Sequence, residues 1–93
     1  MLRIEIPSNG PAQLSFSKFQ RLNMPVPPNG VDQEINDALI VSFEDEREAI
    51  DYSLEMDHYA NSLNDHDSAN YLAAIEIIKA INEDEFVQSY RRR

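Results

Sequence analysis

The chain has 93 residues, of which 42% are apolar and 27% charged, and it carries a formal net charge of −9. This length accommodates one domain with one core, and the composition is typical of a folded globular domain rather than a disordered chain. The chain has no cysteine, which excludes disulfide bonds and thiolate metal sites. We therefore expect residues 1–93 to form a single small domain, with Arg91–Arg93 as a frayed tail.

The negative charge is concentrated in the middle of the chain. Residues 32–67 contain twelve carboxylates and one arginine, a net charge of −11, whereas residues 1–31 carry +2 and residues 68–93 are neutral. Such a segment repels nucleic acid and attracts basic surfaces. The first residues contain no long apolar run, which predicts neither a signal peptide nor a membrane span and favours a cytoplasmic location. We therefore expect a protein partner with a basic surface, and no direct contact with nucleic acid or membrane.

The first quarter of the chain predicts a strand and a short helical turn. Apolar residues alternate with charged ones in Leu2–Ile6, which is typical of a half-buried strand. The alternation recurs in Ala12–Phe16, which predicts a hairpin partner for that strand. From Ser17 the apolar spacing changes to three residues, which predicts a short helical turn that Ser17 caps.

The next segments predict a loop and a buried strand. Pro25–Gly30 contains three prolines and ends in a Pro-Asn-Gly turn, so it is expected to form an ordered loop, either a plain connector or a recognition segment. Val31–Asp37 is acidic with two isolated apolar residues, and we expect it to be irregular or one helical turn. The continuous apolar run of Ala38–Phe43 predicts a buried strand.

Two long helices and one short helix are expected after this strand. Asp45 and Glu48 form a capping-box pattern that predicts a helix from about Glu46 to Leu63. Tyr71–Ile81 predicts a second long helix, antiparallel to the first because the link between them is short. A second capping-box pattern at Asn82 predicts a final helical turn. The expected fold is therefore α+β, with two or three short strands packed against an antiparallel pair of helices, plus a short C-terminal helix.

The helix Tyr71–Ile81 is apolar over about 220° of its circumference, which is wider than one neighbouring element covers. Either the final helical turn folds back over it, or a second copy of the chain covers it as a homodimer. The side chains expected at such a self-association surface are Ile50, Leu54, Tyr71, Ile77, Ile78 and Ile81. Four tyrosines fit either the rim of the core, the interpretation we favour, or a partner surface: Tyr52, Tyr59, Tyr71 and Tyr90.

The main candidate for function is a row of carboxylates predicted on the first long helix. Spacings of four, three and four residues stack them on one side of that helix. Like charges at this spacing cost a helix a few tenths of a kcal/mol per pair, a cost with no evident role in folding that a docking surface for a basic partner would explain. For the row taken by itself, we favour the other interpretation, a solvated face that keeps the protein soluble. These residues, hereafter the acidic row, are Glu44, Glu48, Asp51 and Glu55.

The sequence leaves two other functions open. The acidic row could imitate a phosphate backbone and block a nucleic-acid-binding protein. Glu55 and His58 have the Glu-x-x-His spacing of di-metal sites, and His66 lies in an acidic turn, which would fit a small-ligand or metal-binding protein. The second Glu-x-x-His pair of a di-metal site is missing, and there is no catalytic triad or glycine-rich phosphate loop. We therefore expect a non-catalytic interaction or inhibitor-type protein without catalytic residues, metal or cofactor.

Overall fold

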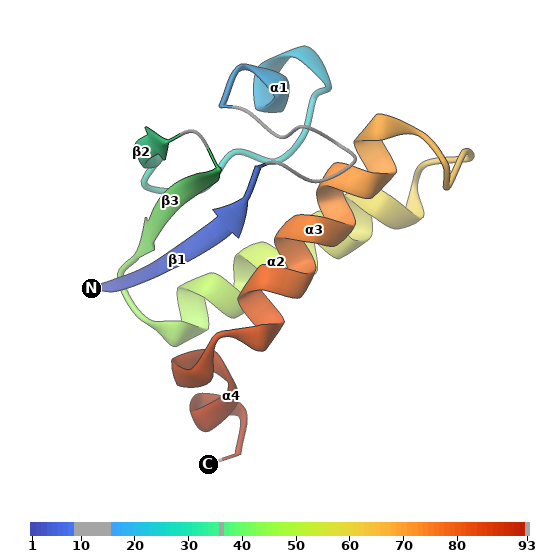
Figure 1. Ribbon diagram of the computed structural model, residues 1–93. Coiled ribbons are helices and arrows are strands. Elements are labelled where there is room, and N and C mark those ends of the chain that lie inside the picture. The colour runs from blue at the N-terminus through green and yellow to red at the C-terminus, as the bar shows by residue number, and fades with distance from the viewer. Residues whose placement is uncertain (9–15, 36, 93) are drawn as a thin grey trace.

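The computed structural model describes residues 1–8, 16–35 and 37–92. A three-stranded antiparallel sheet packs against two long antiparallel helices (Figure 1). The expected α+β class with a short C-terminal helix is therefore confirmed. The elements in chain order are β1 (Leu2–Pro7), α1 (Phe16–Arg21), β2 (Val31–Ile35), β3 (Ala38–Phe43), α2 (Glu46–Asn61), α3 (Ala69–Glu83) and α4 (Glu85–Arg91).

The sheet is built around β3, with β1 and β2 antiparallel on its two sides. The β1–β3 pairing runs from Leu2 opposite Phe43 to Pro7 opposite Ala38. Residues opposite each other share a face of the sheet, so alternate apolar side chains of the two strands point toward the same core. The buried side chains that the two strands place in the core are Leu2, Ile4, Ile6, Leu39, Val41 and Phe43.

The sequence does not reveal β2. Val31–Asp37 is expected to be irregular or helical, but Val31–Ile35 forms an edge strand that pairs with β3, with an irregular register between Val31 and Gln33. Val31 is half-buried and the four residues after it are exposed. An edge strand that is solvated on both faces leaves no period-two apolar signal, because burial does not select apolar residues at alternate positions.

The segment before α1 differs from expectation where it can be compared. Residues 12–15 of the expected hairpin strand lie outside the described residues, and Phe16 begins α1 instead of ending a strand. Ser17 lies inside α1 and therefore does not precede it as a cap. The described partner of β1 is β3, a strand that is apolar except for Ser42 and that pairs with β1 along its whole length.

Side-chain caps begin all three C-terminal helices. Asp45 accepts a hydrogen bond from the Glu48 N–H at 2.9 Å, which confirms the predicted start of α2. Ser68 caps α3 by accepting from the Tyr71 N–H at 3.2 Å. Each cap satisfies a backbone donor that lacks a partner within the helix. α2 ends at Asn61, two residues before the expected Leu63.

Asp84, rather than the predicted Asn82, connects the last two helices. Its extended backbone ends α3, and its carboxylate accepts from the N–H groups of Phe86 and Val87 at 2.9 and 3.1 Å. The chain turns back at this residue, and Val87 becomes fully buried in the core. Arg91, expected in a frayed tail, is the last residue of α4; residue 93 lies outside the described residues.

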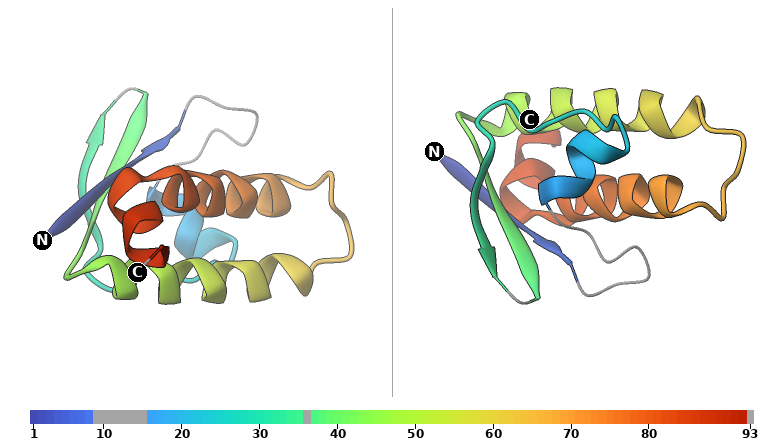
Figure 2. Two further views of the ribbon diagram at one scale, coloured as in Figure 1. Left: turned by 90° about the horizontal axis from the view of Figure 1, so that it is seen from below. Right: turned by 90° about the horizontal axis from the view of Figure 1, so that it is seen from above.

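The two long helices are covered on opposite sides by the two short ones. Seen from above, α1 lies across the space between α2 and α3, and seen from below, α4 lies across part of it (Figure 2). Phe19 of α1 and Val87 of α4 are both fully buried. The broad apolar surface of α3 is therefore covered largely by elements of the same chain, which is the first of the two alternatives expected from its breadth.

Two tyrosines of α2 hold the segment that follows α1. The Tyr52 hydroxyl donates to the Pro25 carbonyl at 2.9 Å, and the Tyr59 hydroxyl donates to the Leu22 carbonyl at 2.8 Å. Tyr52 is only 2% exposed. Burial raises the pKa of its hydroxyl well above the ordinary value, and the nearby charge of Glu55 raises it further. Tyr52 therefore lies within the protein's own core, and Tyr59 packs at its rim, as the favoured interpretation has it.

Candidate protein-binding surface

Three carboxylates of the acidic row lie on α2, and the fourth lies just before it. Spacings of three and four residues place Glu48, Asp51 and Glu55 on one side of the helix over about 10 Å. The sequence predicts Glu44 on the same helix, but α2 begins at Glu46, so Glu44 lies in the link from β3. Glu44, Asp51 and Glu55 are exposed, and Glu48 is half-buried. Three carboxylates of the row are thus open to solvent.

Glu48 has a structural role that the spacing of the row does not reveal. Its Oε1 accepts hydrogen bonds from the Glu44 N–H at 3.1 Å and from Asn29 Nδ2 at 2.8 Å. Asn29 Nδ2 also donates to the Ser42 carbonyl at 3.1 Å. Glu48 therefore fastens the proline loop to α2 and caps the link from β3. This role in folding explains why a like charge is tolerated at Glu48. Among the contacts of the described residues, the other three carboxylates of the row have no such role.

The loop Pro25–Gly30 lies beside the acidic row. The bonds from Tyr52 to Pro25 and from Asn29 to Glu48 attach both of its ends to α2. The Gly30 N–H donates to the Pro27 carbonyl at 2.9 Å, which confirms the predicted turn, and the positive φ of Gly30 (71°) suits glycine. Val26 is 47% exposed. The loop therefore carries an exposed apolar side chain and is attached to the helix that carries most of the row.

Within the described part of the chain, no salt bridge involves the exposed carboxylates of the row. An ion pair at 3.8 Å joins Arg3 Nε to Asp32 Oδ2 on the sheet. Among residues 1–8, 16–35 and 37–92, Glu44, Asp51 and Glu55 have no comparable partner. Uncompensated carboxylates on one side of a helix produce a negative potential that extends into solvent. This side of the protein is therefore suited to a cationic surface.

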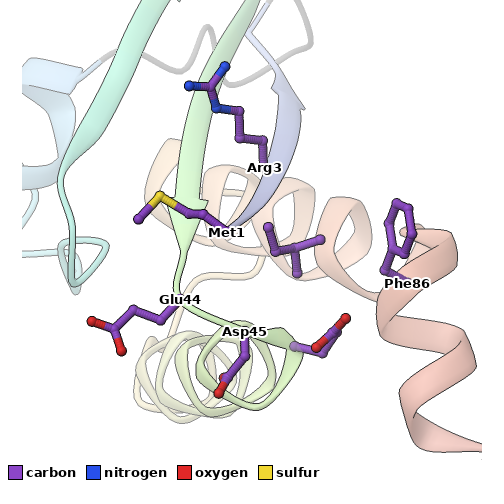
Figure 3. Close-up of a pocket in the computed structure, with 7 residues that line it drawn as sticks. Met1, Arg3, Glu44, Asp45 and Phe86 are labelled. Atoms are coloured by element: carbon purple, nitrogen blue, oxygen red, sulfur yellow. The ribbon is translucent and has the colours of Figure 1, made fainter.

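An open hollow of about 450 Å³ adjoins the Glu44 end of the row. Phe86, at the start of α4, lies on one side of it, and Glu44 and Asp45 in the β3–α2 link lie on the other (Figure 3). Phe86 is 56% exposed, whereas the next residue, Val87, is fully buried. The hollow combines an exposed aromatic side chain with carboxylates and with Arg3 of β1. The sequence pattern does not predict this arrangement, because the walls of the hollow come from distant segments.

The residues expected at the self-association surface separate into two groups. Ile77 and Ile81 are fully buried in the core, so the structure removes them from any surface. They belong to the same core cluster as Val87 of α4, which folds back after Asp84. The residues of the set that remain at least partly exposed are Ile50, Leu54, Tyr71 and Ile78.

The histidines do not form a recognisable metal site. Glu55 and His58 are both exposed on α2. The ring of His66 stacks on Tyr71, with 4.4 Å between ring centroids. In the described part of the chain, no group of three or more His, Cys, Asp or Glu side chains is arranged to hold a metal ion. The Glu-x-x-His spacing is therefore left without the further ligands that such a centre requires.

None of the helices in the described residues has the length and apolar character needed to span a membrane. Comparisons with protein family models, with curated proteins and with solved structures find no match to this chain.

Proposed function

We propose that this protein is a non-catalytic interaction or inhibitor-type protein that presents the acidic row to a partner with a basic surface. The observation that carries the proposal is the set of exposed carboxylates at Glu44, Asp51 and Glu55, which have no ion-pair partner among the described residues. Complementary charge speeds association and selects among partners. The chain contains no cysteine, so it suits a reducing compartment, and we place this interaction in the cytoplasm.

Two neutral features add to this surface. Val26 lies in the loop beside the row, and Phe86 lines the hollow at its Glu44 end. Charged rims contribute little affinity by themselves, whereas buried aromatic and aliphatic side chains often dominate binding energy. A partner that combines basic residues with an apolar side chain would therefore use both parts of the surface.

A variant that removes only the unpaired charges tests this proposal. Glu44→Gln, Asp51→Asn and Glu55→Gln together are expected to weaken binding of a labelled arginine-rich peptide at least about tenfold at low salt. Glu48 stays unchanged, so its bonds to the proline loop are kept. Fluorescence anisotropy at several salt concentrations measures the change, and the loss should shrink as salt screens the charges.

The matched control loses the same number of charges elsewhere. It carries Glu34→Gln, Asp37→Asn and Glu83→Gln, all of which are exposed positions outside the row. We expect it to bind within about twofold of the unmodified protein. An equal loss in both variants would mean that only net charge matters, and the acidic row would not be a binding site.

The nucleic-acid mimic is a special case of the same surface, in which the basic partner is a nucleic-acid-binding groove. It predicts that duplex DNA competes with this protein for a captured partner and that the Glu44, Asp51 and Glu55 variant no longer competes. A partner whose binding is insensitive to DNA would leave the general role and exclude the mimic.

A further inference from the structure

The underside of the helix pair is covered only in part. In the view from below, α4 crosses the ends of α2 and α3 nearest the sheet and does not extend along the rest of the two helices (Figure 2). The structure has a hollow of about 350 Å³ beside the end of α4. Its walls come from all three helices and consist of Ser53, Leu54, Asp57, Ile78, Asn82 and Arg91.

Two of the six residues that line this hollow are apolar, Leu54 and Ile78, and the other four are polar. Leu54 is 59% exposed, although it lies in the middle of a long helix, and Ile75 is 37% exposed. Ile50 is one turn from Leu54 and Ile78 is one turn from Ile75, and both are half-buried. Single exposed apolar residues are ordinary, but partly exposed apolar side chains on two neighbouring helices at the edge of a hollow favour an interface.

The charges in this hollow are balanced, whereas the protein as a whole is strongly negative. Asp57 supplies one negative charge and Arg91 one positive charge, within a protein of net charge −9. Arg91 Nη2 donates to Asn82 Oδ1 at 3.1 Å, which holds the guanidinium against the wall. A second copy of this acidic protein would be repelled at the acidic row, but it meets balanced charge here.

We propose that the α2–α3 underside is the contact surface of a twofold-symmetric homodimer. A twofold interface requires one patch to carry both complementary features, since each copy contributes the same residues. Its shape is self-complementary because the exposed Leu54 lies beside a hollow, and its charge is self-complementary because Asp57 and Arg91 both line that hollow. Leu54 of each copy enters the hollow of the other, and Asp57 of each copy faces Arg91 of the other.

The dimer is independent of the proposed partner binding. At 100° per residue, Asp57 lies about 120–180° around α2 from the helical carboxylates of the row, and Leu54 lies about 60° from Asp51 and about 100–120° from Glu55 and Glu48. Glu48 and Glu55 therefore stay accessible in the dimer, whereas Asp51 lies at its edge. The dimer is tested at Leu54, Asp57 and Arg91 and partner binding at other residues, so the two proposals fail separately.

Sedimentation equilibrium of the full chain over about 1–100 µM is the first test, and a mass approaching twice that of one chain is the expected result at the upper end. Leu54→Glu should raise the dimer dissociation constant at least about tenfold. Ile35→Glu, at a comparably exposed residue of β2, should leave it unchanged. A monomer at every concentration, or equal weakening by the two variants, would overturn the proposal.

A charge exchange makes the test specific to this surface. Asp57→Arg and Arg91→Asp should each give monomers, because each places like charges opposite each other across the twofold axis. An equimolar mixture of the two variants should regain the mass of a dimer, since each contact then joins an arginine to an aspartate. Circular dichroism verifies that both variants are folded. A mixture of folded variants that stays monomeric would contradict the proposed contact.

Discussion

Ile77→Ala is expected to lower the free energy of unfolding by about 2–5 kcal/mol, while Leu54→Ala changes it by no more than about 0.5 kcal/mol. Both are apolar residues on the long helices, and both are predicted from the sequence to lie at a self-association surface. The structure distinguishes the two residues, because Ile77 is fully buried in the core and Leu54 is 59% exposed. Shortening Ile77 leaves a cavity in a close-packed core, whereas shortening Leu54 removes a solvated side chain.

Chemical denaturation followed by circular dichroism measures both values. The protein should be dilute, about 1 µM, so that association through Leu54 adds nothing to the stability. Val87→Ala provides a second core position on α4, and a substantial cost there would show that α4 is folded against the long helices. Equal costs for Ile77→Ala and Leu54→Ala would contradict the described packing of α3.

The stabilities of the unmodified protein and Tyr52→Phe are expected to exchange order between neutral and alkaline pH. Near pH 7 the variant should be less stable by about 1 kcal/mol, because it loses the hydrogen bond to the Pro25 carbonyl. Near pH 11.5 the unmodified protein should have lost about 2 kcal/mol more than the variant, and the variant should then be the more stable of the two.

The sign follows from the pKa of Tyr52, which burial and then the charge of Glu55 raise in the folded protein. In the unfolded chain this hydroxyl ionises near its ordinary pKa of about 10, while the folded protein still holds the proton. Unfolding then releases a proton, so stability falls by about 1.4 kcal/mol per pH unit above that value. The other tyrosines are common to both proteins and largely cancel in the difference. Parallel stability curves from pH 7 to 11.5 would contradict the buried placement of Tyr52.

Local patterns predict most of the elements because each pattern reports which side chains face the core. The alternation in Leu2–Ile6 and the apolar run of Ala38–Phe43 predict β1 and β3, and Asp45 with Glu48 predicts the start of α2. β2 escapes prediction because it is held by pairing with β3 and has little burial of its own. A pattern of hydrophobicity contains no information about a strand that the solvent reaches on both faces.

The candidate site depends on contacts between distant residues, and the sequence predicts only part of it. The row spacing correctly places Glu48, Asp51 and Glu55 on one side of α2. The bond from Asn29 to Glu48 spans 19 residues, so no local pattern predicts that Glu48 fastens the proline loop. The turn at Asp84 likewise decides which apolar residues of α3 stay exposed. The sequence of a single helix predicts how broad its apolar surface is, but packing in the folded chain determines how much of that surface is covered.

Chemical-shift mapping of the ¹⁵N-labelled protein, titrated with the arginine-rich peptide, tests the central claim most directly. The claim predicts saturable shift changes that are largest at residues 44–55 and in the adjoining loop, residues 26–30, and that weaken with added salt. The α3 amides at residues 71–82 should change little, since they lie away from the acidic row. Largest changes at residues 71–82, or changes spread evenly over the protein, would contradict a binding surface on the acidic side of α2.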